Sequence, residues 1–98
     1  MYMLNKNDFW NNFVPWIFSE LNSDFPILSG GFSYTLGGFF GLVDKNDSKN
    51  QVTHQIMNFF RFSSKIELNE VKFDRYIGNK IHKTKDKESN PIISKFLV

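Results

Sequence analysis

The stretch FSYTLGGFFGLV, residues 32–43, decides the fold that the sequence predicts. Two strand-like runs, FSYTL and FFGLV, flank a central Gly37-Gly38 pair. A tight primed turn needs positive φ at its central positions, which glycine adopts without steric cost. A bulky side chain at Gly38 would therefore be strained. Gly41 inside the second run indicates a bulge. We predict a β-hairpin over residues 32–43.

Two other interpretations of this stretch fail. A phosphate-binding loop needs Lys and then Ser or Thr directly after its last glycine, whereas Leu42 and Val43 follow Gly41. Residues 25–43 carry no charge, which approaches the length of a membrane span. However, five glycines and a proline in this range would cost a helix roughly 1 and 3 kcal/mol each, respectively. Asp24 and Asp44 also stand where basic anchors are expected. We expect no membrane span.

The pattern of residues before the hairpin predicts a helix. Its apolar residues recur every fourth position, and polar residues at its start are suited to cap it. Pro15 lies inside the pattern, where it either kinks the helix or opens a second one. The periodic residues are Phe9, Phe13, Ile17 and Leu21, and the candidate caps are Asn5, Asn7 and Asp8.

The chain after the hairpin is less clear. Residues 51–62 fit both a helix, by spacings of four, and a strand, by alternation. A strand is favoured because it would extend the hairpin into a meander. Residues 65–77 alternate apolar and polar side chains and read as two further strands, although Ser64 and Glu67 imitate a helix capping box. Residues 80–90 are expected to form a charged loop, and IISKFLV (92–98) a last strand.

Composition supports a sheet. The 98 residues make a single domain, 1–98, with twelve phenylalanines and no alanine. Alanine is the best helix former, and aromatic residues favour strands. The predicted fold class is therefore α+β: an N-terminal helix packed on an antiparallel β-sheet of five or six short strands.

Motifs for chemistry are missing. The chain has no cysteine, so thiolate catalysis and cysteine-ligated zinc are excluded. Residues 44–55 imitate a calcium loop, but Lys49 and Gln55 replace its sixth-position glycine and its twelfth-position glutamate. His54 and His82 would suit acid–base chemistry only if they met in space. We predict no enzymatic activity, no cofactor and no metal site.

Charge is unevenly distributed. Residues 1–79 hold seven basic and eight acidic side chains, a net of −1, whereas residues 80–98 hold five and two, a net of +3. The basic segment offers Lys80, Lys83, Lys85 and Lys87 to a nucleic-acid backbone. A small nucleic-acid-binding domain is therefore one candidate function. The N-terminus shows no leader pattern, so we expect a cytoplasmic protein.

In its length, composition and helix-then-sheet layout, the chain resembles the immunity proteins of bacterial contact-dependent growth inhibition and related polymorphic toxin systems. WIFSELNSDFP (16–26) and GGFSYTLGGFFG (30–41) are its most individual stretches. The resemblance implies a cytoplasmic inhibitor that binds and occludes a cognate protein toxin, commonly a nuclease, as a heterodimer. Inhibitors of nucleases usually present an acidic face, whereas this chain is basic overall. The local acidic patch expected to bind the partner consists of Asp44, Asp47, Glu67, Glu70 and Asp74.

Overall fold

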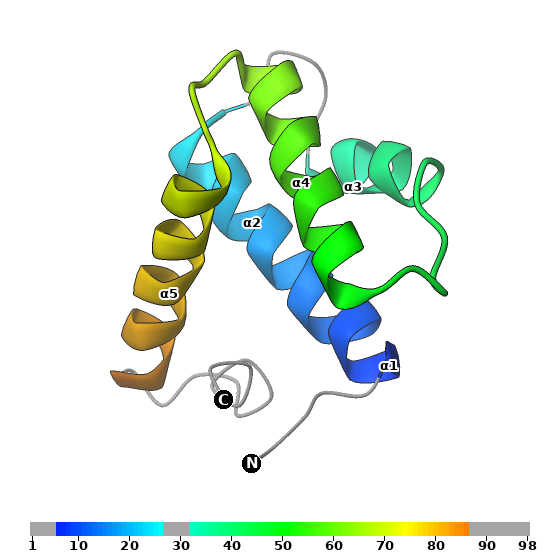
Figure 1. Cartoon of the computed structure of the whole chain (residues 1–98), viewed down its shortest axis with the longest axis horizontal. Coiled ribbons are helices and arrows are strands. Elements are labelled where there is room, and N and C mark those ends of the chain that lie inside the picture. Colours follow the sequence, from blue (N-terminus) through cyan, green and yellow to red (C-terminus); the bar gives the residue numbers. More distant parts are fainter. Residues whose placement is uncertain (1–5, 27–31, 87–98) are drawn as a thin grey trace.

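The computed structural model describes residues 6–26 and 32–86, and these residues form helices joined by short connections (Figure 1). No strand occurs in the described residues, so the predicted α+β fold with an antiparallel sheet is wrong. The expected last strand, 92–98, lies outside them. In chain order the elements are α1 (Lys6–Asp8), a π-helical turn η1 (Phe9–Phe13), α2 (Val14–Asp24), α3 (Phe32–Phe40), α4 (Lys49–Ser64) and α5 (Glu70–Asp86).

The N-terminal helix is present as expected, and it passes through a π turn. In η1 the Val14 N–H donates to the carbonyl of Phe9, five residues back. Pro15 follows in the first turn of α2, where a missing N–H costs least. The backbone is helical at Phe13 and Val14, so the chain passes through the π turn into α2 without leaving the helical conformation, and no helix ends before Pro15. After Asp24 the chain reaches Pro26, which cannot donate a further helical hydrogen bond.

The predicted hairpin at 32–43 is wrong, because Gly37 and Gly38 lie inside α3. Neither glycine has a positive φ, so the backbone makes no turn there. The helix buries Phe39 against α2, and the ring centroids of Phe18 and Phe39 are 4.8 Å apart. This aromatic burial outweighs the low helix propensity of the two glycines.

The predicted strand at 51–62 is also wrong, because these residues belong to α4. Ser48 caps the helix, and its hydroxyl oxygen accepts the backbone N–H of Gln51 at 3.2 Å. One face of α4 packs into the core through buried side chains at helical spacing, namely Val52, Ile56, Met57 and Phe60.

Residues 65–69 form a connection without regular structure, and α5 follows in place of the two strands predicted over 65–77. Asn69 caps α5 by accepting the backbone N–H of Lys72 at 2.9 Å. The buried positions are again four apart: Phe73, Ile77 and Ile81. Helix α5 continues through residues 80–86, so the predicted charged loop is wrong there, and residues 87–90 lie outside the described residues.

Helix α2 lies at the centre, with α5 on one side and α3 and α4 on the other (Figure 1). Phe18 of α2 is fully buried and contacts three rings, those of Phe39, Phe59 and Phe60, at centroid distances of 4.8–5.9 Å. The aromatic residues that suggested a sheet are thus the core of a helical protein. This core holds α4 and α5 beside each other.

Candidate partner-binding groove

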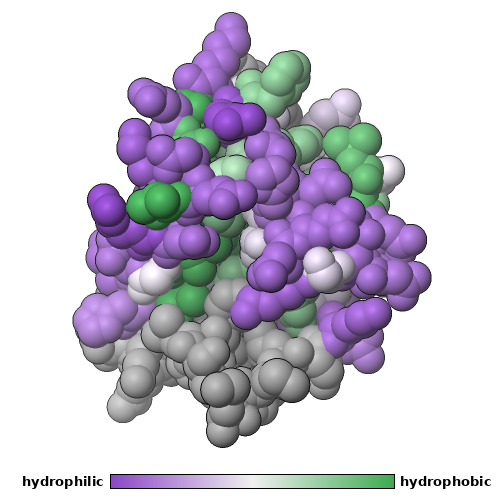
Figure 2. Space-filling view, in the orientation of Figure 1, coloured by the Kyte–Doolittle hydropathy of each residue, from purple (hydrophilic) through white to green (hydrophobic). Residues whose placement is uncertain are grey.

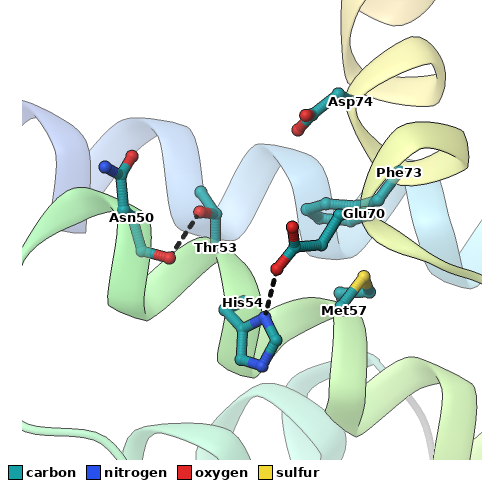
Figure 3. A pocket seen from close by; sticks show the side chains of 7 residues that line it. All are labelled: Asn50, Thr53, His54, Met57, Glu70, Phe73 and Asp74. Carbon is teal, nitrogen blue, oxygen red and sulfur yellow. Dashed lines mark hydrogen bonds and ion pairs between the residues drawn. The ribbon is translucent and has the colours of Figure 1, made fainter.

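A groove runs along the seam between α4 and α5 (Figure 3). Its first part has a volume of about 280 Å³. A second part, of about 300 Å³, shares Asn50, Thr53 and Asp74 with the first. We call both parts together the α4–α5 groove. The first part is also lined by His54, Met57, Glu70 and Phe73, and the second by Lys49, Ile77, Gly78 and Ile81.

The groove has an apolar floor and a polar rim. Met57 and Phe73 are each 3% exposed and form the floor of the first part. Ile77 and Ile81 are buried below the second part, where Gly78 adds no side chain. Figure 2 shows apolar atoms in the seam between α5 and α4, with hydrophilic atoms on both sides. Such a groove suits an amphipathic group, with an apolar stem and a polar end.

The rim carries two carboxylates from one face of α5. Glu70 Oε1 lies 3.3 Å from His54 Nδ1, and both side chains are largely exposed, at 75% and 51%. Asp74 follows one helical turn later, and both carboxylates point from α5 towards α4 (Figure 3). The Thr53 hydroxyl donates to the backbone carbonyl of Asn50 at 2.9 Å. The acidic charge of the groove therefore belongs to Glu70 and Asp74.

The two histidines of the chain lie far apart. His54 pairs with Glu70 at the start of α5, whereas His82 lies twelve residues further along that helix, about 18 Å away. The two histidines therefore do not act on one substrate atom. In the described part of the chain, no three His, Asp or Glu side chains are placed to hold a metal ion. What the arrangement offers is binding of a positively charged group.

The structure brings together two of the five predicted partner-binding residues. Glu70 and Asp74 share the groove. Asp44 instead stabilises the turn before α4, where its Oδ1 accepts the Asn46 N–H at 2.9 Å. The N–H of Asp47 donates to the Asp44 carbonyl in the same turn, and Glu67 is exposed in the connection before α5. These three residues do not line the groove.

Sequence reasoning missed the α4 side of the groove. Asn50, Thr53, His54 and Met57 follow the spacing i, i+3, i+4, i+7, which places them on one helical face. That signal is present in the sequence, but it has meaning only once residues 49–64 are assigned to a helix.

A second polar cluster joins α5 to α2. Lys80 Nζ lies 2.7 Å from Asp24 Oδ2 and 3.1 Å from Glu20 Oε2. The Tyr76 hydroxyl also donates to Asp24 Oδ2, at 3.0 Å. We call these four residues the α2–α5 latch. Lys80 is only 18% exposed, so the first of the four lysines offered to nucleic acid is engaged inside the protein.

The latch changes the pKa of its members. The hydrogen bond from Lys80 lowers the pKa of Asp24, although partial burial opposes this. Burial favours the neutral amine of Lys80, but its hydrogen bonds to Asp24 and Glu20 outweigh burial and raise its pKa. Burial, together with the bond to Asp24, raises the pKa of Tyr76. At neutral pH Asp24 and Lys80 are therefore charged and Tyr76 is neutral.

None of the helices in residues 6–26 and 32–86 has the length and apolar character needed to cross a bilayer. No protein-family model matches the chain, and no curated protein or solved structure was found to be similar to it.

Proposed function

We propose that this protein is a small cytoplasmic inhibitor that binds a cognate protein toxin as a heterodimer and covers its active site. The toxin is a nuclease. The observation that supports this proposal is the pair of exposed carboxylates, Glu70 and Asp74, above an apolar floor between α4 and α5. The helix-then-sheet part of the resemblance to immunity proteins falls with the predicted sheet. Length, composition and local acidity remain in its favour.

The physical case rests on charge complementarity. A nuclease binds a polyanion and therefore presents lysines and arginines around its active site. Carboxylates on the inhibitor accelerate association with such a surface and pair with its cations. A standard interface buries about 800 Å² on each partner, and the total accessible surface here is 6301 Å². The face around the groove has to supply about an eighth of that surface.

Apolar contacts for such an interface are available on α3 and in the turn that follows it. Tyr34 is 76% exposed and Leu42 is 72% exposed. Gly37 and Gly38 between them are also exposed, and green atoms lie over α3 in Figure 2. Aromatic residues are enriched at binding hot spots. An uncharged, partly exposed surface on α3 is consistent with a protein partner.

The alternative, a nucleic-acid-binding domain, is less well supported. Lys80 is held by Asp24 and Glu20, and the carboxylates of the groove repel phosphates. Lys83 is exposed, while the side chain of Lys85 and all of Lys87 lie outside the described part of the chain. Of the four lysines offered to nucleic acid, Lys83 is therefore the one that the structure describes as exposed.

Co-expression with the product of an adjacent toxin gene tests the proposal. We expect a 1:1 complex on size-exclusion chromatography and loss of nuclease activity as the inhibitor approaches equimolar concentration. The purified inhibitor alone should cleave neither RNA nor DNA. A toxin that remains fully active in the presence of excess inhibitor, with no complex formed, would contradict the proposal.

A further inference from the structure

We infer that the α4–α5 groove is a socket for one arginine side chain of a protein partner. This inference rests on the proposed function and names the group that the toxin would present. The guanidinium would bind between Glu70 and Asp74, and the aliphatic stem would cover Met57 and Phe73. A planar guanidinium carries five donors and can engage two carboxylates at once.

The first part of the groove, which is lined by both carboxylates, has a volume of about 280 Å³ and accommodates one long side chain. The floor is apolar and includes the buried ring of Phe73. An arginine stem packs on such a floor, and its guanidinium is attracted to an aromatic ring.

The rim of the first part of the groove favours a cation, because it carries Glu70 and Asp74, whereas Lys49 lines only the second part. No ion pair to Asp74 is found among the residues that the structure describes, in contrast to Asp24, which Lys80 neutralises. Glu70 has His54 as its neighbour, with 3.3 Å between Glu70 Oε1 and His54 Nδ1, and its side chain is 75% exposed. A divalent metal does not fit, because no described group of three ligands is placed to hold one. An organic cation is the occupant that matches both the carboxylates and the floor.

The socket can be tested without the toxin. We suggest titrating the ¹⁵N-labelled protein with the peptide acetyl-Gly-Arg-Gly-amide and following its amide resonances. We expect saturable shifts at groove residues with millimolar affinity, and weaker shifts at high salt because exposed charges are screened. The matched peptide has citrulline in place of arginine. Citrulline keeps the shape and loses the charge, so it should produce no saturable shift.

Substitutions of the carboxylates test whether Glu70 and Asp74 bind the arginine peptide. Glu70→Gln combined with Asp74→Asn should weaken peptide binding about tenfold or more, since hydrogen bonds to charged groups are the stronger kind. The control is the double variant Glu67→Gln with Asp47→Asn, which also removes two carboxylate charges, but outside the groove. It should change the affinity for the peptide less than about twofold. Far-UV circular dichroism would verify that both double variants remain helical.

The outcomes separate the socket from the proposed function. Equal binding of the citrulline peptide, shifts away from the groove, or equal losses in the two double variants would each overturn the socket, even if the protein inhibits a toxin. Arginine-specific binding lost only in the groove variant supports the socket, even if no toxin is inhibited. In that case the proposed function alone would fail.

Discussion

At the scale of single residues, Gly37 and Gly38 are the least expected members of α3. Glycine costs a helix roughly 1 kcal/mol relative to alanine. Neither residue has a positive φ, and a Cβ at either position would meet no atom within 4 Å. The fold of the monomer therefore does not require glycine there. The helix forms because burial of Phe39 compensates for the poor local propensity.

Replacement of Gly38 by alanine should accordingly raise the free energy of unfolding by about 0.5–1 kcal/mol, because it reduces the entropy of the unfolded chain. Urea denaturation of Gly38→Ala beside the wild type measures the change. Gly37→Ala, which is also exposed with open space around its Cβ, serves as a repeat of the same test. A hairpin turn with positive φ would give the opposite sign, so a clear loss of stability in both variants would contradict the α3 assignment.

At the scale of elements, the sequence predicted α2 and failed for α4 and α5. Residues four apart share a face in a helix and also in a strand, so Val52, Ile56 and Phe60 fit both patterns. The two structures differ at the position halfway between two such residues, because that position lies on the same face only in a strand. His54 and Asn58 are polar, and neither is buried, which a buried strand face would not tolerate. The sequence therefore did indicate a helix here. A strand was predicted instead because it would have extended the incorrectly predicted hairpin into a meander.

The site was less predictable than the helices. Glu70 and Asp74 were expected to bind a partner, but their position opposite Asn50 and Thr53 depends on where the 65–69 connection places the start of α5. That placement is set by core packing, including the buried Leu68, and not by local periodicity. Local sequence patterns identify the buried face of each helix. A groove between two helices also depends on how the helices are positioned along each other.

The α2–α5 latch should stabilise the contact between these helices. We predict a coupling of about 1 kcal/mol between Asp24 and Lys80 in a double-mutant cycle of Asp24→Asn and Lys80→Met. The estimate is modest because Asp24 is 38% exposed and water screens the pair. Chemical denaturation of the four proteins gives the coupling. Additive losses would mean that the ion pair contributes nothing.

The pKa shifts of the latch give it a pH dependence. The pKa of Asp24 is lowered by folding, so its stabilisation is present above the unfolded pKa of about 3.9 and is lost as the pH falls through the folded pKa. The pKa values of Lys80 and Tyr76 are raised, so their stabilisation is present below about pH 10 and is lost in stronger alkali. Melting temperatures should therefore fall in acid and in alkali, and Asp24→Asn should reduce the acid dependence.

At the scale of the whole molecule, the side chains that the two candidate functions would use lie on different parts of α5, although Lys72 and Arg75 also lie in its first two turns. Its first two turns carry Glu70 and Asp74 into the groove. Lys80 in the middle is occupied by the latch, and Lys83 beyond it is exposed. A toxin inhibitor would use the carboxylates at the start of the helix. A nucleic-acid-binding domain would use the lysines towards its end.

The last prediction separates these two functions. Glu70→Gln and Asp74→Asn together should cost more than ~2 kcal/mol in toxin affinity, as interface hot spots do, mainly through faster dissociation. A triple variant should barely alter toxin affinity, since charges outside the contact act chiefly on the association rate. It replaces with Gln the residues Lys83, Lys85 and Lys87. Lys80 is left unchanged in this variant because its loss would break the latch. Surface plasmon resonance at two salt concentrations measures both rates.

The same lysine variant tests the alternative. If phosphate contact is the purpose of these lysines, their replacement should weaken nucleic-acid binding steeply and reduce its dependence on salt, because fewer counterions are released. Fluorescence anisotropy with a short labelled RNA and a DNA duplex would detect it. Tight binding to either one that disappears with the three lysines, in a protein that retains no protein partner, would falsify the inhibitor proposal. The groove carboxylates would then keep phosphates away from the first part of the groove itself.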